Sequence, residues 1–267
     1  MNNKGPYLLD SHCHMDFQEF DADRTSTLER CFDLGMKAMV VPGVSTKQWE
    51  RLRLLCEKAF KRSPKLYFAC GIHPWWSENP PAIDSLTFEQ HLNHPLCVAI
   101  GECGLDFYKP IDKTKQLQVF EQQIKLSVDT GMPLVIHSVK AHNEIDAILA
   151  RYTPTAGGVI HGFSGSLQQA QNYWERGFYL GVGGTITYER AQKTRKAVAE
   201  MPLESLLLET DSPAMPLQGH QGERNSPERI IDIAHCLAEL RQESVETITR
   251  QTCINAETLF HLEHGNG

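Results

Sequence analysis

Histidine and carboxylate side chains occur in this chain at points where short apolar runs end. These residues are His12, His14, Glu102, His137, His161 and Asp211. Imidazole nitrogens and carboxylate oxygens are the side-chain atoms that bind divalent cations such as Zn²⁺ and Mn²⁺. A bound cation of this kind lowers the pKa of a water molecule and polarises a carbonyl or phosphoryl oxygen. If the fold gathers these side chains, the sequence predicts a metal-dependent hydrolase.

The first two histidines are separated by a single residue, Cys13. Side chains alternate between the two faces of a strand, so we expect His12 and His14 to point to one side and Cys13 to the other. Cys13 therefore has the wrong direction for a third ligand. An isolated His-x-His pair also occurs as a surface or hydrogen-bonded pair, so the pair alone does not establish a metal site.

The other candidates also have ordinary structural explanations when each is taken alone. His137 and His161 could be hydrogen-bonded core histidines. Glu102 could form a salt bridge in a loop, and Asp211 could cap a turn. Their common placement at the ends of apolar runs favours a shared site instead. Four imidazoles and two carboxylates exceed one tetrahedral ligand set and suit two cations bridged by a carboxylate.

Eight short apolar runs, rich in β-branched residues, predict the strands that would position these residues. The runs are Tyr7–Asp10, Ala38–Pro42, Leu66–Cys70, Val98–Gly101, Leu134–His137, Gly158–His161, Phe178–Val182 and Leu206–Glu209. Several are apolar throughout, which is typical of parallel strands buried on both faces.

Helical patterns separate the strands. Ser45 or Thr46 could cap a helix, Gly131 is expected to end one, and final helices are expected over Pro227–Glu239 and Val245–Phe260. This alternation favours an α/β fold, either a closed (β/α)8 TIM barrel or an open doubly wound sheet. The polar residues favour the barrel, because all C-terminal strand ends meet at its mouth, where barrel active sites form. No linker divides the sequence, so we expect a single domain over residues 1–267.

Composition narrows the class of protein. The formal charge of −7 disfavours a protein that binds nucleic acid over its whole surface, but not a nuclease with a locally positive cleft. The eight cysteines contain no CxxC pair, which suggests reduced cytoplasmic thiols. The N-terminal residues lack the features of a signal peptide, and no stretch approaches the roughly 18 apolar residues of a membrane span. We expect a cytoplasmic protein with no membrane association and no obligate protein partner.

Over nearly its whole length the chain resembles the TatD family of metal-dependent deoxyribonucleases and hydrolases, within the amidohydrolase-like barrels. The motifs that carry the resemblance are Asp10–His14, Gly71–Pro74, Gly101–Asp106, His137–Ser138, His161–Gly165, Gly181–Gly184 and Glu209–Pro213. As a set they are highly specific, whereas His-x-His or Gly-x-His-Pro alone is not. Many amidohydrolase barrels bridge their metals with a modified lysine after the fourth strand, and Glu102 at that position favours the TatD branch.

The resemblance implies a site for two divalent ions, with Zn, Mg and Mn as candidates. One ion would take His12, His14 and Asp211, the other would take His137 and His161, and Glu102 would bridge them. His73 and Arg224, which match family motifs near the mouth, could contact a substrate phosphate. A turn residue and a solvated loop charge are the alternatives for these two positions. Asp106 is expected to orient a ligand histidine or to hold its loop.

The leading hypothesis is a deoxyribonuclease, with DNA as substrate, in which Asp211 takes a proton from the attacking water and passes it to the leaving oxygen. Hydrolysis of a small ester, lactone or amide is the main alternative, because single-strand binders commonly stack bases on aromatics and few aromatics are expected at the mouth. Trp75 and Trp76 could form such a stacking surface or pack under their loop. A metal-stabilised binding protein without turnover, or a three-zinc repair endonuclease, fits the ligand set less well.

Overall fold

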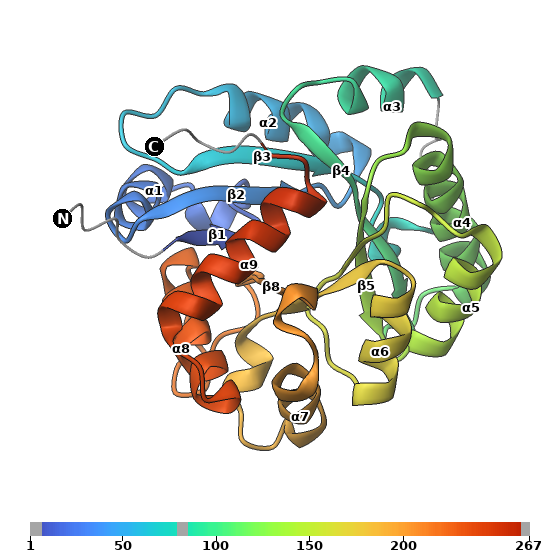
Figure 1. The fold of residues 1–267 in the computed structure, drawn as a ribbon. Coiled ribbons are helices and arrows are strands. Elements are labelled where there is room, and N and C mark those ends of the chain that lie inside the picture. The colour runs from blue at the N-terminus through green and yellow to red at the C-terminus, as the bar shows by residue number, and fades with distance from the viewer. Residues whose placement is uncertain (1–6, 79–84, 263–267) are drawn as a thin grey trace.

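Eight parallel strands form one sheet in which neighbours follow the chain order from β1 to β8 (Figure 1). The structure is a computed structural model that describes residues 7–78 and 85–262. The strands are β1 Leu8–Asp10, β2 Met36–Pro42, β3 Lys65–Cys70, β4 Cys97–Asp106, β5 Leu134–Val139, β6 Gly158–Ile160, β7 Phe178–Val182 and β8 Leu206–Leu208. All eight predicted strands are present, and β4 extends five residues further than expected.

Backbone hydrogen bonds just beyond the ends of β8 and β1 close the sheet into a barrel. The Ser11 amide donates to the Leu208 carbonyl at 3.0 Å, and the Asp211 amide donates to the His12 carbonyl at 2.9 Å. The His14 amide then bonds to the Ser212 carbonyl at 2.8 Å. These bonds hold the chain segments after β1 and β8 against each other, so the predicted (β/α)8 barrel is confirmed and the open sheet is excluded.

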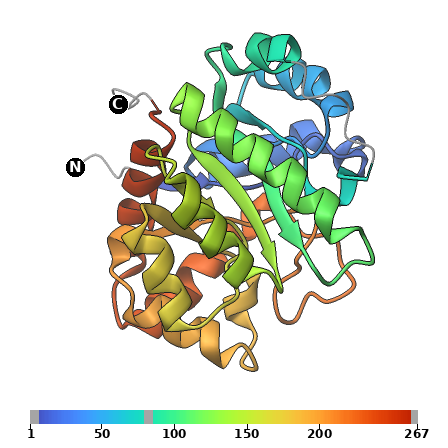
Figure 2. The same cartoon turned by 90° about the vertical axis from the view of Figure 1, so that its right-hand side faces the viewer.

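Helices surround the strands (Figures 1 and 2). They are α1 Arg24–Asp33, α2 Thr46–Glu57, α3 Ser85–Leu92, α4 Lys113–Thr130, α5 His142–Tyr152, α6 Leu167–Glu175, α7 Gln192–Glu200, α8 Ile230–Arg241 and α9 Val245–Leu259. Ser45 stands at the N-cap of α2, and Gly131 ends α4 with φ +69°, as the sequence predicts. The helix expected from Pro227 begins instead as a 3-10 turn, Pro227–Arg229, and α8 proper starts at Ile230.

Two apolar clusters follow from the alternation of strand side chains. Outward residues such as Phe68 and Ile136 pack against the surrounding helices. Figure 2 shows one of these helices, α4, lying along β4. Inward residues such as Val135 and Val159 form a second cluster with the last turns of α9 and with Phe260, which follows that helix. The barrel is therefore filled by side chains toward its N-terminal end. Its polar residues are left for the opposite end.

A register shift in β4 places Glu102 inside the barrel. Ala99 belongs to the inner cluster and Ile100 to the outer one, so strict alternation would turn residue 102 outward. The pairing of β4 with β5 shifts between Gly101 and Cys103, and Cys103 lies in the outer cluster. Glu102 consequently points into the barrel, whereas strict alternation would have placed its side chain on the outer side.

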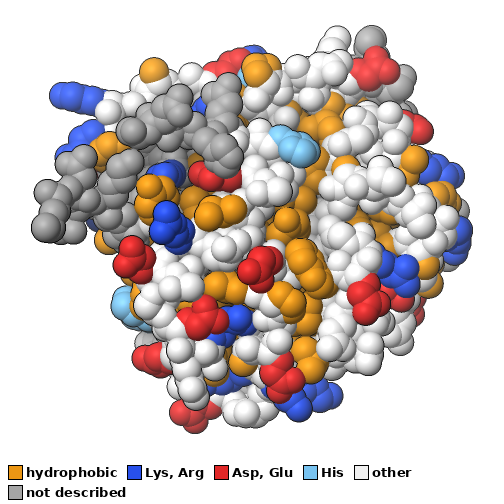
Figure 3. Space-filling model, in the orientation of Figure 1, with side chains coloured by type: hydrophobic (Ala, Val, Ile, Leu, Met, Phe, Trp, Pro, Cys, Tyr) orange, Lys and Arg blue, Asp and Glu red, His pale blue; other side chains and the backbone are white. Residues whose placement is uncertain are grey.

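The length of the described helices and the distribution of charged side chains on one face bear on contacts with membranes and nucleic acids. None of the helices within residues 7–78 and 85–262 has the length and apolar character needed to cross a bilayer. Acidic and basic side chains are interspersed on the face that carries α9 (Figure 3). That face therefore offers no extended basic surface to a nucleic acid.

Candidate metal centre

His12 and His14 lie in the segment that follows β1, not within the strand itself. β1 ends at Asp10, and the backbone hydrogen bonds to the segment after β8 fix the direction of the chain from Ser11 onward. Both Nε2 atoms nevertheless face the same point and lie 3.2 Å apart. Cys13 points the other way, with Sγ 3.1 Å from the Ser212 hydroxyl. The predicted orientations are observed, although barrel closure produces them in place of strand alternation.

Glu102 occupies the centre of the polar cluster and is 2% exposed. Its Oε2 lies 3.4 Å from His12 Nε2 and 3.5 Å from His14 Nε2. Its Oε1 lies 2.8 Å from His161 Nε2 and 3.0 Å from His137 Nδ1. The two carboxylate oxygens therefore face two different pairs of histidines.

Asp211 completes the group on the His12 and His14 side. Its Oδ1 lies 3.6 Å from His12 Nε2 and 3.4 Å from His14 Nε2. Its backbone has a positive φ of 53°, and its amide is bonded to the His12 carbonyl. The Asp211 side chain is 17% exposed, compared with 3% for that of Glu102. Asp211 is thus the more open of the two carboxylates.

His73, which the sequence predicted as a substrate contact or a turn residue and not as a ligand, also enters the cluster. Its Nε2 lies 3.3 Å from Glu102 Oε1, and its donor atoms lie within 4.8 Å of those of Glu102 and His137. Its Nδ1 accepts the Trp75 amide at 3.2 Å. The Gly-x-His-Pro turn therefore delivers a third imidazole to the His137 side of Glu102. The position of this histidine three residues after the end of β3 was the available signal.

The donor atoms fit a cation site. Two pairs of ring nitrogens face each other at short range, 3.2 Å for His12 and His14 and 3.0 Å for His137 and His161. Two nitrogen ligands about 2.0 Å from one tetrahedral ion would lie about 3.3 Å apart. The opposite ring nitrogens of all four histidines are buried and have no hydrogen-bond partner among the described residues. Converging imidazoles around a buried carboxylate are the donor set expected for Zn²⁺, Mn²⁺ or a similar ion.

Electrostatics keep Glu102 in its ionised form. Burial alone would raise the pKa of this carboxyl, but the surrounding His73, His161 and His12 hold its pKa well below the ordinary value. Burial lowers the pKa of His73 to about 4, so that imidazole is neutral near pH 7. The centre therefore combines a permanent negative charge with a neutral nitrogen donor, which is the form in which these groups bind cations.

Two further carboxylates support the histidines from behind. Glu209 is fully buried, with Oε1 3.5 Å from His161 Nδ1. Asp106 Oδ2 lies 3.6 Å from His137 Nε2 and accepts the Trp75 indole N–H at 2.7 Å. Asp106 thus lies where a residue that orients His137 should lie, as the sequence suggested. Glu209 was not singled out, although it stands directly at the end of β8.

Arg224 lies apart from the cluster. Its guanidinium forms a bidentate salt bridge with Asp23, with N–O distances of 2.8 and 2.7 Å, and lies over the Phe20 ring. A substrate phosphate would have to compete with Asp23 for this group. The cavity at the cluster is about 130 Å³ and is lined by His14, Phe17, Val44, His73, Trp75, Trp76, Glu102, His137, His161, Asp211 and Ala214. A phosphate contact by Arg224 remains a prediction.

Comparison with known proteins identifies the family to which this chain belongs. The sequence model described as TatD related DNase matches residues 9–261. The chain belongs to the TatD-related DNase family. This confirms the resemblance carried by the strand-end motifs.

Relatives of this TatD-family chain match it over nearly all of its length. It is 38% identical to an uncharacterized metal-dependent hydrolase, YjjV, of Escherichia coli K12, over 96% of this chain and 98% of the relative. It is 36% identical to an uncharacterized metal-dependent hydrolase of Haemophilus influenzae, over 95% and 99% of the two chains. The crystal structure of YjjV, a TatD homolog, superposes with a TM-score of 0.90 over 96% of this chain and 98% of that one.

Proposed function

We propose that this TatD-family protein is a metal-dependent hydrolase that cleaves phosphodiester bonds in DNA. The observation that carries the proposal is the position of Glu102, whose two oxygens each face a separate pair of imidazoles. Membership of a family described as DNases supports DNA as the substrate. The names of the relatives support metal-dependent hydrolysis.

The arrangement suits two divalent ions, one on each side of Glu102. His12, His14 and Asp211 would hold one ion, and His137 and His161 would hold the other. His73 is close enough to Glu102 Oε1 to add to the second set. When bound, the ions would supply an acidified water and an electrophilic contact to the phosphoryl oxygens.

Asp211 is the residue best placed to accept a proton. Its side chain reaches the cavity and is more exposed than that of Glu102. Burial would raise its pKa, but the bond to His14 and the charges of His12 and His161 keep its pKa below the ordinary value. An ionised carboxylate at the open side of the cluster can take the proton of the attacking water and return it to the leaving oxygen.

The small cavity is also compatible with the alternative substrate class. Its volume of about 130 Å³ is below the roughly 300 Å³ at which pockets for drug-sized ligands begin. A single phosphodiester group of a longer strand fits this space, and so does a small ester, lactone or amide. The cavity volume therefore does not distinguish a nuclease from a small-molecule hydrolase, and a direct comparison of substrates is needed.

A substrate screen tests the proposal. Labelled single-stranded DNA and a panel of lactones, esters and amides are incubated with the protein and Mg²⁺, Mn²⁺ or Zn²⁺. We expect DNA cleavage, and we expect Asp211→Asn to lower its turnover by about 10²- to 10⁴-fold. Asp129→Asn, an exposed aspartate of α4, is the matched control and should keep wild-type activity. Hydrolysis confined to the small-molecule panel would refute the nuclease assignment.

The proposal also includes a cytoplasmic location. All eight cysteines are free, and six of them are buried. Unpaired thiols in this number are typical of proteins kept in a reducing compartment. Mass spectrometry of alkylated protein from intact cells is expected to find them reduced.

A further inference from the structure

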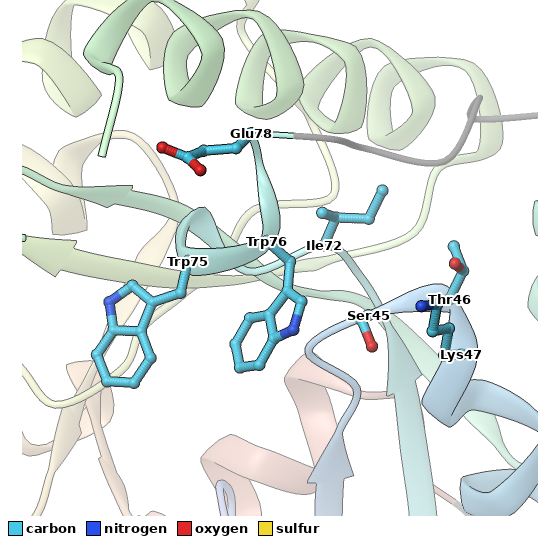
Figure 4. A pocket seen from close by; sticks show the side chains of 7 residues that line it. All are labelled: Ser45, Thr46, Lys47, Ile72, Trp75, Trp76 and Glu78. Atoms are coloured by element: carbon cyan, nitrogen blue, oxygen red, sulfur yellow. The ribbon is translucent and has the colours of Figure 1, made fainter. Parts of the chain in front are cut away.

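A groove of about 420 Å³ lies beside the metal-site cavity, between the start of α2 and the 3-10 turn Pro74–Trp76 (Figure 4). The indole rings of Trp75 and Trp76 lie side by side along this groove. Ser45 and Lys47 line it from the beginning of α2. A volume of this size accommodates a group as large as a nucleoside.

The two indoles are unusually open for tryptophan side chains. Trp75 is 45% exposed and Trp76 is 42% exposed, whereas tryptophans are highly buried on average. Trp75 is fixed in place, because its N–H donates to Asp106 and the Lys109 ammonium lies 4.6 Å from its ring centre. The Trp76 ring lies 6.2 Å from that of Trp75, with an angle of 26° between the planes. The pair therefore presents an apolar aromatic surface on a rigid support.

This surface is continuous with the metal centre. Trp75 and Trp76 line both the groove and the metal-site cavity. The edge of the His73 ring meets both indoles, at centroid distances of 5.0 and 5.6 Å, and His73 Nε2 lies 3.3 Å from Glu102. Only one side chain separates the indoles from the carboxylate at the centre. A group held in the groove would thus lie close enough to the centre to belong to the nucleotide next to a bond cleaved there.

Charge around the groove is arranged asymmetrically. Lys47 is exposed at the α2 side and forms no salt bridge with any residue that the structure describes. Glu78 lines the groove beyond the tryptophans. A phosphate would be attracted to the Lys47 side and repelled from the Glu78 side, while a flat uncharged ring can lie on the indoles. A fatty acyl chain, by contrast, could pack on the indoles but would make no use of the Lys47 ammonium.

We propose that this groove is a subsite for the base of the nucleotide next to the scissile phosphate, with the base stacked on Trp76. The proposal rests on the phosphodiesterase function proposed above and specifies its substrate as single-stranded nucleic acid. Stacking on an aromatic side chain tolerates any base, because every base has a π-face. The subsite would therefore select for an unpaired strand and not for a sequence.

The test compares two oligomers of equal length and charge. One is an eight-nucleotide strand of thymidine, and the other carries abasic residues throughout. The measured quantity is the ratio of kcat/KM for the thymidine strand to that for the abasic strand. We expect a ratio of about 10 to 100 for the wild type, in line with the contribution of one stacked base. In Trp76→Ala this ratio should fall close to 1, and Trp76→Phe, which retains a ring, should restore most of it.

Phe32→Ala provides the matched control. Phe32 is a similarly exposed aromatic residue, 47% exposed, at the end of α1 that precedes β2, and its removal should leave the ratio at the wild-type value. A ratio that is unchanged in Trp76→Ala would overturn the subsite while leaving the nuclease function intact. A wild type that cleaves neither oligomer with Mg²⁺, Mn²⁺ or Zn²⁺ would overturn the nuclease function, and the subsite with it.

Discussion

The Nε2 atoms of His12 and His14 face each other at 3.2 Å, and the Nδ1 atom on the far side of each ring is buried without a hydrogen-bond partner among the described residues. Two imidazole lone pairs directed at one point repel each other unless a proton or a cation lies between them. The observed contact is favourable when one ring donates an Nε2–H to the other, or when a cation lies between the two nitrogens.

Metal removal should therefore lower the thermal stability of the protein. A cation present at about 100 times its Kd stabilises the folded state by about 2.7 kcal/mol. In a chain of this size that corresponds to a fall in Tm of about 5–10 °C when the ion is chelated. Differential scanning calorimetry with EDTA or with added Mn²⁺ measures the shift. His14→Ala should show a smaller shift, and a shift equal to that of the wild type would place the stabilising ion elsewhere.

Gly181→Ala is expected to disturb His161 through Glu209. A Cβ at Gly181 would lie 2.1 Å from Glu209 Oε2, closer than atoms can approach, and 3.0 Å from the His161 Cα. Glu209 is fully buried, so its side chain would have to shift within the core, and we expect a loss of about 1–3 kcal/mol in unfolding free energy. Metal affinity, measured by calorimetric titration, should fall as well.

Gly183→Ala is the matched control for that substitution. A Cβ at Gly183 would have its nearest neighbours at 3.6 Å, an ordinary contact distance, although they belong to the same Glu209 residue. Stability and metal affinity should stay near their wild-type values. Equal losses in the two variants would show that the strand-to-loop junction, and not the Glu209 position, determines the effect.

The salt bridge between Arg224 and Asp23 provides a test of the predicted phosphate contact. If Arg224 binds substrate, it must leave Asp23 to do so, because both guanidinium nitrogens used in the bridge are engaged. Asp23→Ala should then lower KM for DNA by about 2- to 5-fold, since exposed salt bridges contribute about 1 kcal/mol or less. Arg224→Ala should raise KM. Steady-state kinetics in which both variants shift KM upward would mean that Arg224 acts by holding its loop.

The barrel and most of its polar centre could be predicted from the sequence because they follow from simple periodicities. Continuous apolar runs such as Leu206–Leu208 mark parallel strands, and a parallel barrel brings their C-terminal ends to one mouth. His137 and His161 follow such runs directly. The convergence of these histidines on Glu102 could therefore be predicted without knowing the conformation of any loop.

The features that the sequence did not predict depend on irregular backbone. The register shift at Gly101–Cys103 has no signature in residue type, yet it turns Glu102 inward. The turn at Pro74 places His73 Nε2 3.3 Å from Glu102 Oε1. Secondary-structure propensities do not predict the course of the chain through such a turn. Arg224 was taken as a candidate phosphate contact because it matches a family motif near the mouth, and its salt bridge with Asp23, about two hundred residues earlier in the chain, has no signature in the sequence. Long-range pairs of this kind appear only once the fold is known.

The number of ions bound per chain tests the central claim most directly. Metal-free protein is saturated with Mn²⁺ or Zn²⁺, dialysed and measured by elemental analysis, with turnover on DNA recorded for the same samples. We expect about two ions per wild-type chain, and we expect Glu102→Gln to lose at least one of them together with about 10²-fold or more of its turnover. Glu175→Gln, an exposed glutamate of α6, should match the wild type. Wild-type protein that retains no ion, or Glu102→Gln that keeps both its ions and near-normal turnover, would contradict the account.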